Sequence, residues 1–190
     1  NDEVYLPKVM VAQIHEANEN NIVNNEYWFP NLHDTRYFFS PSAYGLEEGE
    51  GYYGHSYWLL WQMQYGISDD LSIGFGTTLI GLPTSLNVKY CQEIKNNLNV
   101  ALGYFWVGDL FNVTGGDENS FVNLPYTVLT TGSKEKNLSI GFGYNLQEIS
   151  NSDIDAIDRI ALNIGGVTRF SRRFSLVFEG WLLNIGSDEP

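Results

Sequence analysis

His55 and Ser56 are neighbouring residues whose types could supply a general base and a nucleophile. Such catalysis requires the imidazole to lie within hydrogen-bonding reach of the hydroxyl, and a third group to orient the imidazole. Both residues fall in a stretch where apolar and polar residues alternate as in a β-strand. Consecutive side chains of a strand point to opposite faces. The pair is therefore badly placed for acid–base chemistry, and we predict no catalytic residues and no enzymatic activity.

Asp153, Asp155 and Asp158 are a second candidate, because carboxylates in one polar loop are the oxygen ligands that Ca²⁺ prefers. The stretch lacks the glycine and the terminal glutamate of the helix–loop–helix calcium motif. The single cysteine, Cys91, and three histidines give no spacing typical of structural zinc. We therefore predict no metal and no cofactor, with a calcium site in this loop as the alternative.

The composition restricts the class of protein. The chain has 190 residues, of which 43% are hydrophobic and 17% are charged, which is less charge than the roughly 25% of a typical soluble domain. It contains no run of apolar residues long enough for a transmembrane helix, which needs about 20. The net charge of −13 repels phosphate backbones and argues against nucleic acid as a partner.

The beginning of the chain differs from the rest. Residues 1–34 are polar, rich in asparagine and acidic, and have neither a helical nor a strand period. We expect them to form an extension that plugs the interior of the fold, lies in the periplasm or binds a partner. Residues 35–190 are long enough for one folded domain.

The dominant pattern from residue 52 onward is the two-residue alternation of β-strands. One face carries large apolar side chains, and the opposite face is mostly glycine, serine and asparagine. A soluble sheet would carry longer polar and charged side chains on its polar face, whereas small residues suit the crowded interior of a membrane barrel. The nine predicted strands cover residues 35–44, 52–65, 71–80, 85–93, 98–107, 121–131, 137–146, 159–170 and 173–183.

This partition assigns side chains to lipid or to the interior. The predicted lipid-facing residues include Leu59, Trp61, Ile73, Phe75, Leu98, Val100, Leu102, Ile140, Phe142, Leu162, Leu176 and Phe178. In the strand at 121–131 the lipid face is predicted to carry Val122, Leu124, Tyr126 and Val128. Charged residues predicted on the inner face are Arg36, Lys89, Arg159, Arg169 and Glu179. Because a small barrel is filled by its own side chains, we expect these charges to be paired inside it, with a solute path as the alternative.

Tight turns and longer loops alternate between the predicted strands. The tight turns lie at 68–70, 95–97, 134–136 and 171–173. The longer or looser connections, which as a group are rich in glycine, asparagine and acidic residues, lie at 45–51, 80–85, 107–120 and 146–158. This is the arrangement of outer-membrane barrels, with short periplasmic turns and longer extracellular loops. The carboxylates of the longer loops predict one strongly anionic rim.

The number of predicted strands is odd, whereas bacterial single-chain barrels have an even number. We therefore expect a tenth strand that residues 35–190 lack. Residues 4–14, or a partner, could supply it instead.

Several stretches resemble a known group of proteins. Residues 35–44 (TRYFFSPSAY), 48–53 (EGEGYY), 65–74 (YGISDDLSIG) and 138–144 (LSIGFGY) are similar to largely uncharacterised outer-membrane barrels of Bacteroidota, Flavobacteria-like. The resemblance covers residues 35–183. It implies a location in the cell outer membrane and a barrel in which a last strand usually follows. It implies no activity and no catalytic residues.

The sequence therefore predicts an all-β protein, a small antiparallel up-and-down transmembrane β-barrel of eight to ten strands, ten being expected. The predicted role is that of a non-enzymatic structural or accessory component of the outer membrane, or of a subunit in a larger assembly. Outer-membrane lipid is the expected partner, together with other outer-membrane or periplasmic proteins. The alternatives are a soluble barrel or sandwich that binds a lipid or glycan, and a lipid-modifying barrel enzyme that uses His55.

Overall fold

The computed structural model describes residues 22–23, 25–31, 33–56, 60–112, 115, 120–146 and 160–183. The chain divides into two compact units, Asn1–Pro30 and Asn31–Pro190. In the first unit β1 (Ile22–Val23) and β2 (Glu26–Tyr27) pair as a short antiparallel hairpin. Among the described residues no helix is long and apolar enough to cross a membrane.

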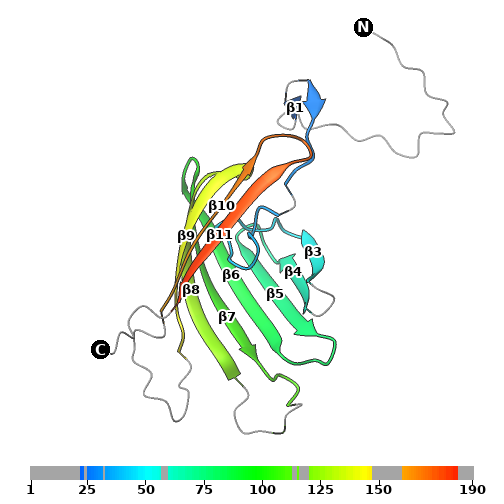
Figure 1. The fold of residues 1–190 in the computed structure, drawn as a ribbon, viewed down its shortest axis with the longest axis vertical. Coiled ribbons are helices and arrows are strands. Elements are labelled where there is room, and N and C mark those ends of the chain that lie inside the picture. Colours follow the sequence, from blue (N-terminus) through cyan, green and yellow to red (C-terminus); the bar gives the residue numbers. More distant parts are fainter. Residues whose placement is uncertain are drawn as a thin grey trace, which may run out of the picture. The chain divides into compact units, whose positions relative to one another are not determined.

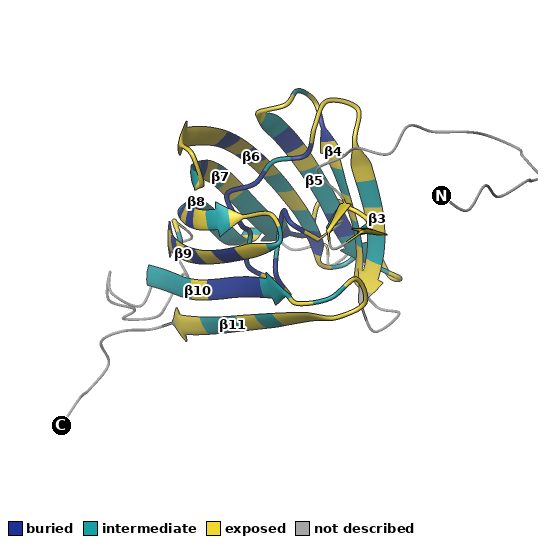
Figure 2. Cartoon of the chain, turned by 90° about the horizontal axis from the view of Figure 1, so that it is seen from above, coloured by how far each residue is buried: buried dark blue, intermediate teal, exposed yellow. Residues whose placement is uncertain are grey.

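The second unit contains one antiparallel sheet of nine strands, in which each strand pairs with the next along the chain. The fold is therefore all-β, as predicted. The sheet curls strongly around an interior (Figures 1 and 2), but its edge strands do not pair with each other, so it is not closed. The strands are β3 (Gly51–Ser56), β4 (Leu60–Gly66), β5 (Leu71–Thr78), β6 (Thr84–Lys95), β7 (Leu98–Gly108), β8 (Ser120–Ser133), β9 (Lys136–Tyr144), β10 (Ile160–Arg169) and β11 (Ser175–Leu183).

Two of the predicted strands are wrong. Residues 52–65 form not one strand but the hairpin of β3 and β4, in which Ser56 lies opposite Leu60. The sequence from 57 to 61 is apolar throughout, so it does not indicate where β3 ends and β4 begins. Residues 35–44 form no strand of the sheet, and the described part of this stretch makes only an isolated bridge between Arg36 and Pro41.

The β3–β4 hairpin changes the side on which residues 45–51 lie. The backbone N–H of Glu48 donates to Asp69 Oδ1 at 3.0 Å, and that of Gly49 donates to the Gly66 carbonyl at 3.0 Å. Gly66 is the last residue of β4, and Asp69 lies in the tight turn between β4 and β5, so the prediction of a loop on the opposite side is wrong. The acidic residues 47, 48 and 50 therefore belong to the tight-turn end. Most other carboxylates of the predicted anionic rim, from 117 to 189, lie outside the described residues.

The two faces of the sheet differ sharply in exposure. Leu102 and Ile140 on the convex face are 58% and 57% exposed, whereas their neighbours Ala101 and Ser139 on the concave face are fully buried. Of the residues predicted to face lipid, Leu59 lies outside the described residues. The exposed ones are Trp61, Ile73, Leu102, Ile140, Phe142, Leu176 and Phe178, and the half-buried ones are Phe75, Leu98, Val100 and Leu162.

The predicted faces of β8 are reversed. Val128 lies opposite the fully buried Ala101 and is itself buried, and Tyr126 packs against the same buried cluster. Gly103 lies opposite Tyr126, and a Cβ atom at Gly103 would come within 2.3 Å of the Tyr126 ring. The small inward residues of one strand therefore make room for large inward residues of the next. The alternation within β8 alone carries no information about this pairing.

This packing predicts the effect of filling the space above the glycine. Gly103→Ala should lower the free energy of unfolding by about 1–3 kcal/mol, because overpacking a filled interior forces side chains out of their rotamers. Gly180→Ala is the matched control, since a Cβ atom there meets only Ile164 Cγ2 at an ordinary 3.5 Å. Denaturant titration of both variants measures the difference. If Gly103→Ala unfolds at the same denaturant concentration as wild type, Tyr126 does not occupy this space.

Candidate functional site

Residues 33–46, named here the interior segment, lie inside the curled sheet rather than in it. Ser40, Ser42 and Ala43 are almost completely buried, and Tyr44 and Leu46 are buried as well. A buried chain without strand partners must satisfy its backbone polar groups in another way. Inward side chains of the sheet provide most of the partners.

Lys89 of β6 anchors the segment through its backbone. Lys89 is 6% exposed, and its ammonium group donates to the carbonyl oxygens of Thr35 at 3.1 Å, Ser42 at 3.2 Å and Tyr44 at 2.7 Å. An ammonium has three donors, so these carbonyls match its full capacity. One buried charge thus joins the two ends of the loop formed by residues 35–44.

A chain of hydroxyl groups holds the opposite side of the segment. The Tyr37 hydroxyl lies 2.6 Å from Ser139 Oγ of β9 and also donates to Asn137 Oδ1. Ser139 Oγ lies 2.6 Å from Thr130 Oγ1 of β8, which accepts the backbone N–H of Ala43 at 2.8 Å. These small polar residues therefore bind the segment as well as providing space.

The tip of the segment contacts both edges of the open sheet. Glu179 of β11 accepts the backbone N–H groups of Phe38 at 2.8 Å, Phe39 at 3.0 Å and Ser40 at 3.2 Å. On the other side Arg36 donates to Gln62 of β4, and its guanidinium carbon lies 5.1 Å from the centre of the Tyr52 ring of β3. The two edge strands, which do not pair directly, are thus linked through the interior segment.

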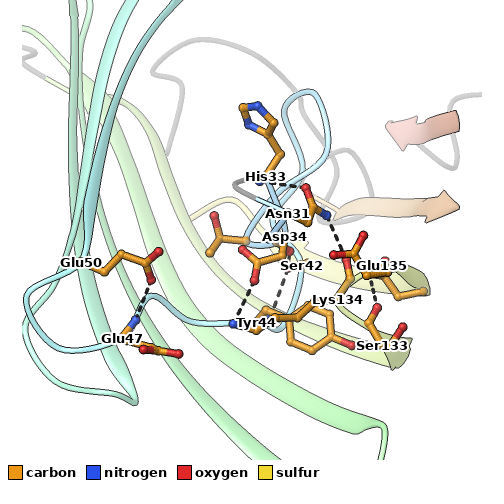
Figure 3. A network of polar contacts seen from close by, with 12 residues as sticks. Asn31, His33, Asp34, Ser42, Tyr44, Glu47, Glu50, Ser133, Lys134 and Glu135 are labelled. Atoms are coloured by element: carbon orange, nitrogen blue, oxygen red, sulfur yellow. Dashed lines mark hydrogen bonds and ion pairs between the residues drawn. The ribbon is translucent and has the colours of Figure 1, made fainter. Parts of the chain in front are cut away.

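A polar network surrounds the segment at the tight-turn end (Figure 3). Asn31 Nδ2 donates to the Lys134 carbonyl at 2.9 Å, and Lys134 Nζ lies 3.1 Å from Asp34 Oδ2. Burial raises the pKa of the Asp34 carboxyl, against the opposing effect of Lys134. Burial opposes the charge of Lys134 too, but Asp34 outweighs it and raises the pKa of Lys134. Burial also raises the pKa of Tyr44 to about 12.

A cavity of about 300 Å³ lies inside the sheet next to the interior segment. Every strand of the sheet contributes to its lining, which agrees with the curl in Figure 2. One lining residue from each strand, in chain order, is Tyr52, Gln62, Ser72, Asn87, Phe105, Tyr126, Gly143, Asn163 and Trp181. The interior segment and this cavity together form the candidate functional site.

The predicted inner charges do not pair with one another in the described residues. Lys89 and Glu179 bind backbone groups of the interior segment, and Arg36 belongs to that segment rather than to a strand. Arg169 pairs at 3.1 Å with Glu135, in the tight turn between β8 and β9. Arg159 lies outside the described residues.

The described residues that were considered for catalysis or metal binding lie apart from one another. His55 lies on the outer face of β3, with its ring 6.5 Å from that of Tyr53. Cys91 is buried in a cluster with Ala43, Ala101 and Val128. Within the described residues no group of histidine, cysteine and carboxylate side chains is arranged to hold a metal ion. Asp153, Asp155 and Asp158 fall outside the described residues.

Comparison with protein families, with curated proteins and with solved structures finds no match for this chain.

The sequence pattern predicts Lys89 and Glu179 on the inner face, in agreement with the structure. It also predicts a strand at residues 35–44, which contain the backbone groups that these two side chains bind. The signal that was available is the Ser-Pro-Ser run at 40–42. Proline has no backbone N–H and is unfavourable inside a strand.

Proposed function

We propose that the strands between residues 51 and 183 form the wall of a small β-barrel in a bacterial outer membrane, and that the protein is a non-enzymatic structural or accessory component there. The observation that carries this proposal is the exposure of large apolar residues along the convex face. Leu102, Ile140 and Leu176 are all more than half exposed. Contiguous apolar surface of this kind is rare on soluble monomers and marks contact with lipid or a partner.

The interior is partly filled by the chain itself, which supports an accessory role over transport. Barrels of about eight strands are just wide enough for their own side chains, and here the interior segment takes up part of that space. Lys89 of β6 and Glu179 of β11 both bind it from the concave face of the sheet. The barrel wall is then a rigid support, and its loops or its N-terminal unit would bind other outer-membrane or periplasmic proteins.

The resemblance to outer-membrane barrels of Bacteroidota supports the same location. One further strand between β3 and β11 would close the sheet with ten strands, an even number as in other bacterial barrels. The free edges of both strands leave their outward backbone groups available for such pairing.

Quenching of tryptophan fluorescence by brominated lipids tests the proposal. Trp61 of β4 and Trp106 of β7 lie on the outer face, whereas Trp181 of β11 lines the interior cavity. The protein reconstituted in vesicles with brominated acyl chains should be strongly quenched relative to plain vesicles. Quenching depends on contact with the acyl chains, so it should arise from the outward rings.

Variants separate the two faces. The double variant Trp61→Phe/Trp106→Phe should lose much of the quenching, and Trp181→Phe should retain it. A protein that stays in the aqueous phase as a monodisperse monomer, or whose quenching comes from Trp181, would refute the membrane assignment.

A further inference from the structure

The interior cavity lies in the part of the sheet that the interior segment leaves unfilled. Thr35, Arg36, Phe39 and Pro41 of the segment line one part of it. Strand residues that line it include Ser85 and Trp181, which lie close to the ends of β6 and β11 away from the tight turns. A molecule in the cavity would therefore rest on the segment and lie toward the end of the sheet away from the tight turns.

Four amide side chains line this cavity: Gln62, Gln64, Asn87 and Asn163. The Oδ1 atoms of Asn87 and Asn163 are buried and accept no hydrogen bond within the described part of the chain. Buried acceptors are normally satisfied, so each such atom requires an explanation. The terminal torsion of asparagine is soft, and each amide can therefore turn to offer a ligand either its donor or its acceptor.

The charges around the cavity argue against a cationic ligand. Arg36 and Lys89 are the charged residues that line it in the described structure, and no carboxylate does. The ammonium of Lys89 is already bound to carbonyl oxygens, and the guanidinium of Arg36 is bound to Gln62. A cation would be repelled, and the Lys89 ammonium has no donor left for an anion.

Aromatic side chains also line the cavity, and the space is small. Phe105, Tyr126 and Trp181 offer apolar surface beside the amides. Ligand sites combine such apolar walls with a few polar groups that fix the orientation of the ligand. The cavity volume of about 300 Å³ lies at the lower end of the range for such sites. One or two sugar rings would match both its size and its mixture of apolar faces and hydroxyl partners.

We propose that the cavity is a binding site for a small neutral sugar, whose hydroxyl groups bind Asn87 and Asn163 and whose ring packs against Trp181. The site is built entirely by the concave face and the interior segment. It is therefore independent of whether the convex face contacts lipid, and it adds a ligand to a protein proposed above as a structural component.

Isothermal titration calorimetry with defined sugars tests this inference. The probes are glucose, N-acetylglucosamine and maltose, together with the charged glucosamine and glucuronate. The protein must be kept in a detergent without a sugar headgroup, because a glucoside or maltoside would compete. At least one neutral probe should bind with a Kd of about 1 mM or tighter. The cationic glucosamine should bind at least tenfold more weakly than glucose, and the anionic glucuronate should bind no more tightly than glucose.

Variants assign the binding to the cavity. The double variant Asn87→Leu/Asn163→Leu should weaken binding at least tenfold, and so should Trp181→Ala, which leaves the amides intact. Asn99→Leu, near the tight-turn end of β7 and outside the lining, should bind as wild type does. Circular dichroism confirms that each variant is folded. No binding of any neutral probe, unchanged binding in both cavity variants, or tighter binding of a charged probe would overturn the inference.

Discussion

Ile140→Arg is expected to lower the free energy of unfolding in lipid by about 2–4 kcal/mol and to reduce membrane insertion. Ile140 lies in the middle of β9, between the outward residues Leu129 of β8 and Ile164 of β10. All three are exposed apolar side chains. At this depth an arginine would have to lie in hydrocarbon or deform the bilayer around it. On a protein surface in water, the same substitution would change stability by less than about 0.5 kcal/mol.

Ile94→Arg provides the matched control for this prediction. Ile94 is 60% exposed, close to the 57% of Ile140, but it lies at the end of β6 beside the tight turn. The cost of arginine falls to about 0–1 kcal/mol near the membrane interface. After folding into vesicles, denaturant titration should therefore give different free energies of unfolding for the two variants. For a protein surface in water the two values would be similar. Equal stability and equal insertion of both variants would rule out lipid at Ile140.

Alternation predicted the strands well because it reflects the pleat of a single strand. From β5 onward the predicted strands correspond to strands of the sheet, and Leu102 and Ile140 lie on the exposed face. The pattern failed in β8, where both faces carry large residues. Tyr126 faces inward because Gly103 lies opposite it, and Leu124 lies next to Gly143 for the same reason. Such a choice depends on cross-strand pairing, which a single strand does not encode.

The interior segment could not be predicted from alternation, because its backbone partners are side chains of distant strands. The carbonyl of Tyr44 binds Lys89, and the N–H of Ala43 binds Thr130, which is 87 residues away. The apolar residues of 35–44 resemble a strand locally. The sequence did single out the inner charges Lys89 and Glu179, but it supplied no acceptor or donor for them. It therefore predicted ion pairs where the structure has charge-to-backbone contacts.

Lys89→Met is expected to release the interior segment while the sheet remains. Methionine fills a similar volume but removes the donor from three carbonyl groups, those of Thr35, Ser42 and Tyr44. A buried acceptor left without its donor typically costs about 1–3 kcal/mol. The hydroxyl contacts of Thr130 and Ser139 and the carboxylate of Glu179 are then among the contacts left to hold the segment against the sheet.

Hydrogen exchange of the Ala43 and Ser42 amides measures this release. Both are bonded in the wild-type protein, Ala43 to Thr130 Oγ1 and Ser42 to the Thr35 carbonyl. In Lys89→Met they should exchange at least tenfold faster, whereas amides in the centre of β7 should stay protected. Lys95→Met, on the same strand but exposed, controls for the loss of a positive charge and should leave both amides unchanged. If the segment stays equally protected in Lys89→Met, the hydroxyl contacts and Glu179 are sufficient to hold it. The three carbonyl groups would then stabilise the buried charge of Lys89, and Lys89 would not be needed to anchor the segment.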